Sequence, residues 1–128
     1  MSHTFDSPFC NVSYLPADRV VLIVWKQFCR LDDYRRPALF ALELLRANVG
    51  SSLVIDARRG FEDDPADVDW AFQCLLPAMA ETGCKAVAFI MNEANDIEDE
   101  MDMWGRELRK YFELRRAASY EDAMKSLV

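Results

Sequence analysis

The sequence has few of the residues that metal sites and redox centres use most. It contains one histidine, His3, and its four cysteines, Cys10, Cys29, Cys74 and Cys84, include no pair at CxxC spacing. A His-rich metal site and a CxxC redox pair are therefore excluded. We predict no bound metal, and we expect four reduced thiols, most of them buried and packed as small hydrophobic side chains.

Long apolar stretches and catalytic motifs are also missing. No apolar run approaches the roughly 20 residues that a membrane helix needs, and Met1 to Pro8 lacks the charged-then-apolar pattern of a signal peptide. We therefore expect no membrane span and a cytoplasmic location. No nucleophile elbow, P-loop or dinucleotide fingerprint occurs. We predict no catalytic residues and no cofactor, and an enzyme is the minority interpretation.

Positive charge is scarce as well. The 128-residue chain has 22 acidic and 15 basic residues, which gives a formal net charge of −7. This balance argues against nucleic acid or an anionic membrane as a partner, because both bind basic surfaces. The hydrophobic fraction of 52% and the three tryptophans argue against disorder. We expect a flexible N-terminus over residues 1–9 and a single domain over residues 10–128.

Strands and helices alternate along this domain. Apolar runs predict strands at residues 10–15, 19–25, 52–56, 85–91 and 112–118. Caps, glycines and helical periodicity predict helices from Asp32 or Asp33 to about Val49, from Asp64 to about Thr82, from Asp96 to about Tyr111, and from Ser119 to Leu127. The order β-β-α-β-α-β-α-β-α predicts an α/β fold with a mixed five-stranded sheet. The first two strands would form an antiparallel hairpin, and helical crossovers would join the parallel strands that follow.

Two further features of the longer helices are predicted. The first helix is expected to turn an apolar stripe inward, namely Leu31, Ala38, Leu42, Leu45 and Val49. Pro77 lies inside the second helix, where its missing N–H predicts a kink or a break.

The most informative segment is Ser52 to Gly60. A buried strand ends there in Asp56, followed by Arg58 and Arg59. The carboxyl ends of such strands are where ligands bind in open α/β sheets. Two neighbouring guanidinium groups could clamp an anion or a carboxylate at this edge.

Trp25 and Trp70 could supply the apolar wall of such a site. The candidate ligand- or partner-binding residues are therefore Trp25, Asp56, Arg58, Arg59 and Trp70. The alternative is structural: Asp56 pairs with one of the arginines or with Lys85, and both tryptophans belong to the core.

Several short motifs follow one another as in a known family. Trp25 ends the second strand, Asp56-Ala57-Arg58 ends the third, Asp69-Trp70 lies early in the next helix, Pro77 precedes Thr82-Gly83-Cys84-Lys85-Ala86-Val87-Ala88, and Ser119-Tyr120-Glu121-Asp122-Ala123 opens the last helix. Together they resemble the SpoIIAA-like (STAS/SEC14-type) group of small bacterial proteins, over nearly the whole chain from about Asn11. The resemblance implies a two-layer STAS-like fold.

The phosphorylation switch of that family does not carry over. Anti-sigma-factor antagonists bear a phosphorylatable Ser or Thr in the loop after the third strand. Here residues 57–66 contain no Ser, Thr or Tyr. Asp63, Asp64 and Asp67 could mimic a constant negative charge there, although acids at a helix N-terminus need no function to explain them.

Two kinds of binding function follow. The first is a non-catalytic STAS-like regulatory module that acts through protein–protein interaction, with a protein partner or as a homodimer. The alternative is a SEC14-type carrier or sensor of a small apolar or amphipathic ligand in a cavity rimmed by Trp25, Arg58 and Trp70. Because Arg58 and Arg59 could bind an anion, we also include small anions among the expected ligands. A small enzyme that uses Asp56 and Arg58 is the third interpretation.

Overall fold

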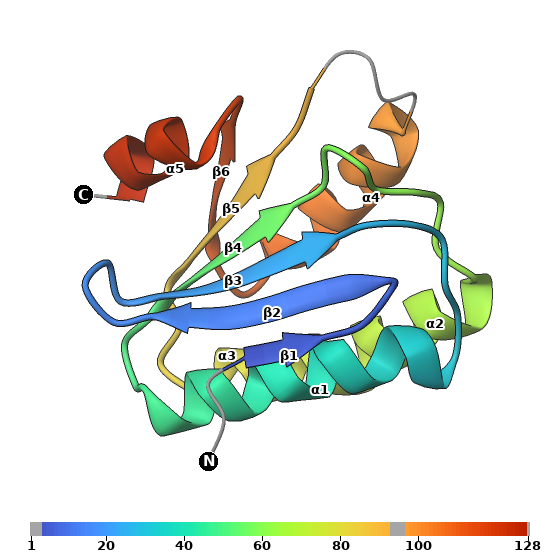
Figure 1. The fold of residues 1–128 in the computed structure, drawn as a ribbon, viewed down its shortest axis with the longest axis horizontal. Coiled ribbons are helices and arrows are strands. Elements are labelled where there is room, and N and C mark those ends of the chain that lie inside the picture. The colour runs from blue at the N-terminus through green and yellow to red at the C-terminus, as the bar shows by residue number, and fades with distance from the viewer. Residues whose placement is uncertain (1–3, 93–96, 128) are drawn as a thin grey trace.

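A six-stranded sheet runs through the molecule, with its strands in the same order as in the chain (Figure 1). The computed structural model describes residues 4–92 and 97–127, so His3 and the expected helix cap Asp96 lie outside the described residues. The strands are β1 (Thr4–Asp6), β2 (Cys10–Leu15), β3 (Val20–Trp25), β4 (Ser52–Asp56), β5 (Ala86–Ile90) and β6 (Glu113–Ala117). Strands β1 to β3 pair antiparallel, and β3 to β6 pair parallel.

The helices fall between the parallel strands and after the last one. They are α1 (Asp32–Ala47), the run α2 (Pro65–Trp70), η1 (Ala71–Leu75) and α3 (Leu76–Ala80), then α4 (Glu98–Leu108) and α5 (Tyr120–Leu127). Two expected caps are present: the Asp64 carboxylate accepts the Ala66 N–H, and the Ser119 hydroxyl oxygen accepts the Asp122 N–H. Within the described residues, no helix is long and apolar enough to cross a membrane.

The α/β class and the mixed sheet agree with the sequence prediction, but the sheet has six strands where five were expected. The difference is β1, which lies in the segment that was expected to be flexible. It pairs with β2 from Thr4 opposite Ser13 to Asp6 opposite Asn11. Its central residue, Phe5, packs on the core with its ring centroid 5.7 Å from that of Phe40. Three residues are too few to show a strand periodicity in the sequence.

The strand order explains why the helices are divided unequally between the faces of the sheet. Right-handed crossovers that always step to the next strand in one direction must place their helices on one face. The main core accordingly joins α1, α3 and α4 to that face, through residues such as Leu45, Met79, Val87, Phe89 and Leu108. This layer, between sheet and helices, is where a cavity can form.

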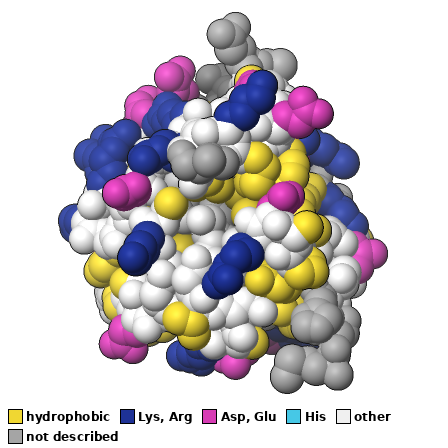
Figure 2. All heavy atoms as spheres, turned by 90° about the vertical axis from the view of Figure 1, so that its left-hand side faces the viewer, with side chains coloured by type: hydrophobic (Ala, Val, Ile, Leu, Met, Phe, Trp, Pro, Cys, Tyr) yellow, Lys and Arg dark blue, Asp and Glu magenta, His cyan; other side chains and the backbone are white. Residues whose placement is uncertain are grey.

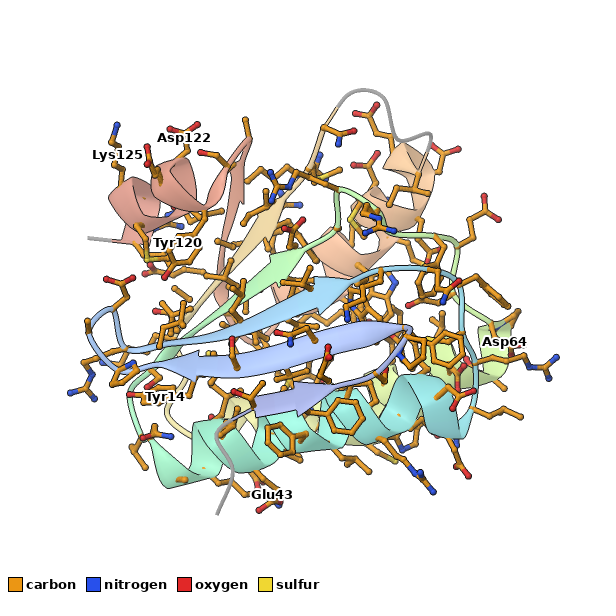
Figure 3. The ribbon with its side chains drawn as sticks, viewed as in Figure 1. Tyr14, Glu43, Asp64, Tyr120, Asp122 and Lys125 are labelled. Carbon is orange, nitrogen blue, oxygen red and sulfur yellow. The ribbon has the colours of Figure 1, made fainter. Side chains whose placement is uncertain are left out.

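The opposite face is covered in part by α5. A smaller cluster there holds Val54, Ala88 and Ala123, with Tyr120 packed against it. The Tyr120 hydroxyl reaches from α5 to the β2–β3 turn, where it donates to the Asp18 carboxylate at 2.7 Å (Figure 3). At the end of the molecule that carries this turn and α5, hydrophobic side chains gather in one area among Lys and Arg (Figure 2).

Pro77 neither breaks nor ends its helix. The chain passes through one π-helical turn, η1, before α3, and the Leu76 N–H bonds to the carbonyl of Ala71, five residues back. Pro77 has no N–H to donate to the preceding turn, and a wider turn absorbs that loss. The helix stays continuous and carries Leu75, Leu76 and Met79 along the sheet.

The start of α1 depends on a buried carboxylate. Asp67, which is fully buried on α2, accepts the Leu31 N–H at 2.9 Å and the Arg35 Nε–H at 2.8 Å. Leu31 has φ 53° and ψ −127°, a backbone conformation that residues other than glycine rarely adopt. This contact therefore holds a strained residue at the helix N-terminus.

The expected inner stripe of α1 is right at its centre and wrong at its ends. Ala38, Leu42 and Leu45 are buried, whereas Leu31 is 43% exposed and Val49 is 67% exposed. Leu31 turns outward because the strained backbone precedes the first helical turn. Val49 lies beyond the last turn, which ends at Ala47.

Replacing Asp67 with alanine should lower the free energy of unfolding by about 2–4 kcal/mol, because the Leu31 N–H and the Arg35 guanidinium would both lose their buried acceptor. Asp69→Ala, which removes an exposed carboxylate from the same helix, is the matched control. Urea unfolding of both variants measures the difference. An equal loss in the two variants would contradict this role for Asp67.

Candidate functional site

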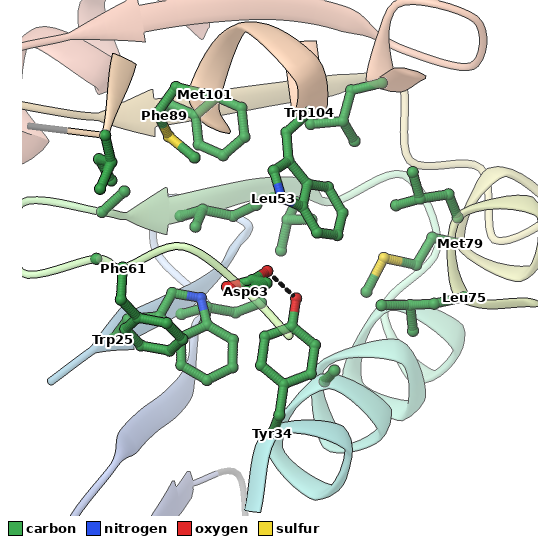
Figure 4. Close-up of a pocket in the computed structure, with 18 residues that line it drawn as sticks. Trp25, Tyr34, Leu53, Phe61, Asp63, Leu75, Met79, Phe89, Met101 and Trp104 are labelled. Carbon is green, nitrogen blue, oxygen red and sulfur yellow. Dashed lines mark hydrogen bonds between the residues drawn. The ribbon is translucent and has the colours of Figure 1, made fainter. Parts of the chain in front are cut away.

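An apolar cavity of about 70 Å³ lies between the sheet and the helices that cover it (Figure 4). The sheet contributes Ile23 of β3, Leu53 and Ile55 of β4, and Phe89 of β5. These side chains share one face because residues two apart in a strand point the same way, and the parallel register aligns Ile23, Ile55 and Phe89. The floor of the cavity is therefore a row of neighbouring strands.

Three helical segments form the opposite wall. Tyr34 and Ala38 come from α1, Met79 from α3, and Met101 and Trp104 from α4. Each pair lies three or four residues apart, so both members face the sheet from the same side of their helix. The π-helical turn adds Leu75, and the cavity is thus enclosed by every helix on this face except α2.

The cavity opens at the carboxyl edge of the sheet. Trp25, at the end of β3, and Gly60, Phe61 and Asp63, in the loop after β4, line it and keep part of their surface exposed. Ligands were expected at this edge, where the chain leaves the parallel strands for the helices. The opening is formed by the loop over residues 57–64.

Aromatic rings surround the opening. The rings of Trp25 and Tyr34 stack with centroids 4.9 Å apart, and Phe61 meets Trp25 edge-on at 5.8 Å. Phe28, which is 53% exposed, extends the group outward and meets Phe61 edge-on at 5.4 Å. Packing of this kind holds large, rigid apolar surfaces in place.

One polar pair points into this apolar setting. The Tyr34 hydroxyl donates to Asp63 Oδ2 at 2.7 Å, as the dashed line in Figure 4 shows. Beside the pair, Glu100 Oε2 accepts the Trp104 indole N–H at 2.8 Å and the Asp63 backbone N–H at 3.3 Å. Asp63 and Glu100 are thereby brought together from a loop and from α4.

Burial changes the acidity of both members of the pair. It raises the pKa of Asp63 from 3.8 to about 7; the hydrogen bond from Tyr34 opposes the rise, while the charges of Glu100 and Asp67 add to it. Burial, followed by the charge of Asp63, also raises the pKa of Tyr34 well above 10. At neutral pH, Asp63 is thus divided between its neutral and charged forms, and Tyr34 remains a hydrogen-bond donor.

The residues expected from the sequence are only partly brought together. Trp25 lines the cavity, but Asp56 and Arg58 do not. The Arg58 guanidinium donates to both Asp56 oxygens, at 2.7 and 3.1 Å. Strand alternation turns Asp56 to the face opposite Ile55, so this pair lies outside the cavity. The structural alternative, in which Asp56 pairs with an arginine, describes this contact.

Arg59 and Trp70 lie outside the cavity lining as well. Arg59 is exposed in the loop. Trp70 is partly buried against the main core, with the Arg35 guanidinium carbon 5.1 Å from its ring centre. Of the expected rim residues, Trp25 lines this cavity, whereas Arg58 and Trp70 do not, and Trp70 lies against Arg35 of α1.

The polar pair of Asp63 and Tyr34 was not predicted from the sequence. Asp63 was interpreted, together with Asp64 and Asp67, as a mimic of a constant negative charge or as an acid at a helix start, and Tyr34 was not singled out. Asp64 and Asp67 behave as helix-start acids with structural partners, whereas Asp63 precedes the cap and turns into the cavity. The sequence signal that could have pointed to this site was Phe61, an aromatic residue directly before the acidic run Glu62-Asp63-Asp64.

Three of the four cysteines are shielded from solvent. Cys10, Cys29 and Cys84 are buried, and burial raises the pKa of Cys29 to about 12 and that of Cys84 to about 11, which keeps both as thiols. Cys74 is exposed. Within residues 4–92 and 97–127, no three His, Cys, Asp or Glu side chains are grouped as a metal site would require.

No family model matches the chain, and no curated protein or solved structure is significantly similar to it.

Asp63→Asn should change how stability depends on pH. The folded carboxyl, with its pKa of about 7, binds its proton more tightly than the unfolded one near 3.8. The contribution of this carboxyl to the free energy of unfolding is therefore complete below about pH 4, and it is lost as the pH rises to 7. Relative to the wild type, the variant should gain about 1–4 kcal/mol between pH 4 and pH 8.

The measurement is urea unfolding at a series of pH values. Glu62→Gln, which neutralises an exposed acid next to Asp63, is the control and should show no such gain. A constant difference between the Asp63→Asn variant and the wild type across this range would contradict a buried carboxyl with a raised pKa.

Proposed function

We propose that this chain is a binding module whose cavity takes a small apolar or amphipathic ligand, as a carrier or sensor. The observation that carries the proposal is the cavity itself: an almost wholly apolar lining with one convergent polar pair, Asp63 and Tyr34. Small-molecule sites combine these two features, since apolar walls provide affinity and a few fixed polar groups orient the ligand.

The size of the cavity restricts the ligand. Its volume of about 70 Å³ is roughly half of the ~150 Å³ that holds a benzene ring in an engineered apolar cavity. A short alkyl chain or part of a ring fits inside. The remainder of the ligand would extend past Phe61 to the open edge.

This proposal develops the SEC14-type side of the family resemblance. Supporting it are the run of elements from β2 onward, which follows the expected alternation, and an opening next to Trp25. Membership of the STAS-like family, a bacterial origin and a cytoplasmic location remain predictions. The enzyme that uses Asp56 and Arg58 loses support, because these side chains pair with each other away from the cavity.

Filling the cavity should abolish binding. Ala38→Leu projects three extra carbons into the space from α1, and n-butanol serves as a neutral probe. In NMR titrations of the wild type, the indole N–H signals of Trp25 and Trp104 should shift more than that of Trp70, which lies outside the lining. The Ala38→Leu variant should bind butanol at least about tenfold more weakly, because a filled cavity leaves no room for it.

Ala47→Leu makes the same change at an exposed position of α1 and should bind as the wild type does. If Ala38→Leu does not fold, Ala57→Val adds bulk to the cavity from the end of β4 instead. Absence of butanol binding in the wild type, or unchanged binding in a folded, filled variant, would contradict the proposal.

Protein–protein interaction is the second candidate, and one observation favours it. Phe28 and Leu31 are both exposed, at 53% and 43%, in the segment that leads from β3 into α1. A contiguous exposed apolar patch is typical of contact surfaces, and these two residues lie three positions apart in the chain. Phe28 also touches Phe61 of the cavity opening, so a partner here would sense whether the cavity is occupied.

If this surface joins two copies of the chain, sedimentation velocity should show concentration-dependent dimers of the wild type. Phe28→Asp should weaken that association by about tenfold or more, because it places a charge in an apolar contact. Val49→Asp, at the opposite end of α1, is the control for an exposed apolar residue. A monomeric wild type at all concentrations would rule out the homodimer.

A further inference from the structure

Two carboxylates, Asp67 on α2 and Asp63 in the loop just before α2, contact the start of α1 in different ways. Asp67 and Asp63 lie four residues apart, and both reach the first turn of α1. Asp67 binds the Arg35 guanidinium at 2.8 Å and the Leu31 N–H. Asp63 binds the neutral hydroxyl of Tyr34. The charge of Asp67 is therefore balanced by a cation, whereas Asp63 is paired with a neutral hydrogen-bond donor.

The cavity provides no cation of its own. Among the eighteen described residues that line it, Asp63 is the only Asp or Glu, and none is Lys, Arg or His. The ion pairs of the described residues place the nearby cations elsewhere: Arg35 with Asp67, and the largely exposed Arg30 with Asp64 at 3.3 Å. A cation that reaches Asp63 would have to come with the ligand.

We infer that the ligand carries a protonated amine on a short apolar body, with its ammonium group against the Asp63 carboxylate and its hydrocarbon part inside the cavity. This inference rests on the proposed function and specifies its ligand class. The ammonium group would do for Asp63 what the Arg35 guanidinium does for Asp67. A charge-assisted hydrogen bond of this kind is strongest where water is excluded.

The surroundings favour a cation over a neutral or anionic group. The groups that face Asp63 are Tyr34 of α1, Glu100 of α4, Asp67 of α2 and the thiol of Cys29 before α1. Two of these are carboxylates; Asp67 is already paired with Arg35, so Glu100 is the further carboxylate that would attract an ammonium group. The rings of Trp25 and Phe61 at the opening are also compatible with a cation, since aromatic faces attract positive charge.

The pH dependence of binding follows from the same geometry. An ammonium group requires the charged form of Asp63, whose pKa is about 7 in the empty cavity. Affinity for an amine should therefore fall by about tenfold between pH 8 and pH 6, where the amine itself stays protonated. A neutral ligand has no such requirement.

The experiment compares three head groups on one four-carbon chain: n-butylamine, n-butanol and pentanoate. NMR titrations of the full chain at pH 8 should give the order of affinity butylamine, butanol, pentanoate, with at least a tenfold advantage for the amine over the alcohol. Lowering the pH to 6 should reduce or remove that advantage.

The outcomes separate this inference from the proposed function. Butanol binding as tightly as butylamine, or pentanoate binding best, would overturn the amine while leaving a ligand cavity in place. An amine preference that does not change with pH would also overturn it, because the contact would then not involve Asp63. No binding of any of the three would contradict the proposed function itself.

Two variants test the contact directly. Asp63→Asn keeps an acceptor for Tyr34 and removes the charge, so the advantage of butylamine over butanol should disappear. Glu62→Gln, an exposed neighbour, should retain it. Glu100→Gln removes a charge that raises the pKa of Asp63, so the pH at which the amine loses affinity should move below its wild-type value. An unmoved midpoint would contradict this assignment.

Discussion

The contact on which this structure depends most is the one between buried Asp67 and the first turn of α1. By accepting the Leu31 N–H and the Arg35 guanidinium, it holds a strained backbone and fixes where the helix begins. Tyr34 lies between these two anchored residues, so its ring is placed against Trp25 and its hydroxyl against Asp63. The polar pair in the cavity is therefore positioned by an ion pair that lies outside the cavity.

The topology explains why there is room for a cavity at this place. Because the strand order never reverses, three successive crossovers put their helices on one face of the sheet. At the carboxyl edge, the loop over residues 57–64 leads from β4 to α2. That loop carries Phe61 and Asp63, and the cavity opens beneath it. The other face has α5 and closes around a small cluster.

The sequence predicts those features that rest on local patterns. The boundaries of β2 and β4 follow from apolar runs, and the start of α2 from Asp64 and Pro65. It does not predict β1, which three residues cannot indicate, or the site, which depends on long-range packing. Asp63 and Tyr34 are 29 residues apart in the chain, and Asp63 and Glu100 are 37 apart. The arginines after β4 were the more prominent signal, yet Arg58 already binds its neighbour Asp56.

The features of the site are ones that a protein selected for stability alone would avoid. The charged form of a buried carboxyl is destabilised when its partner is a neutral hydroxyl. An unfilled cavity also costs stability, because the side chains around it lack packing contacts. Both lie at the same position, where exposed Phe28 contacts Phe61 of the opening and strained Leu31 precedes Tyr34 by three residues in the chain. Local departures from good packing and charge balance gather at functional sites, where a ligand supplies what the protein lacks. A ligand with an apolar body and a cationic head would supply both.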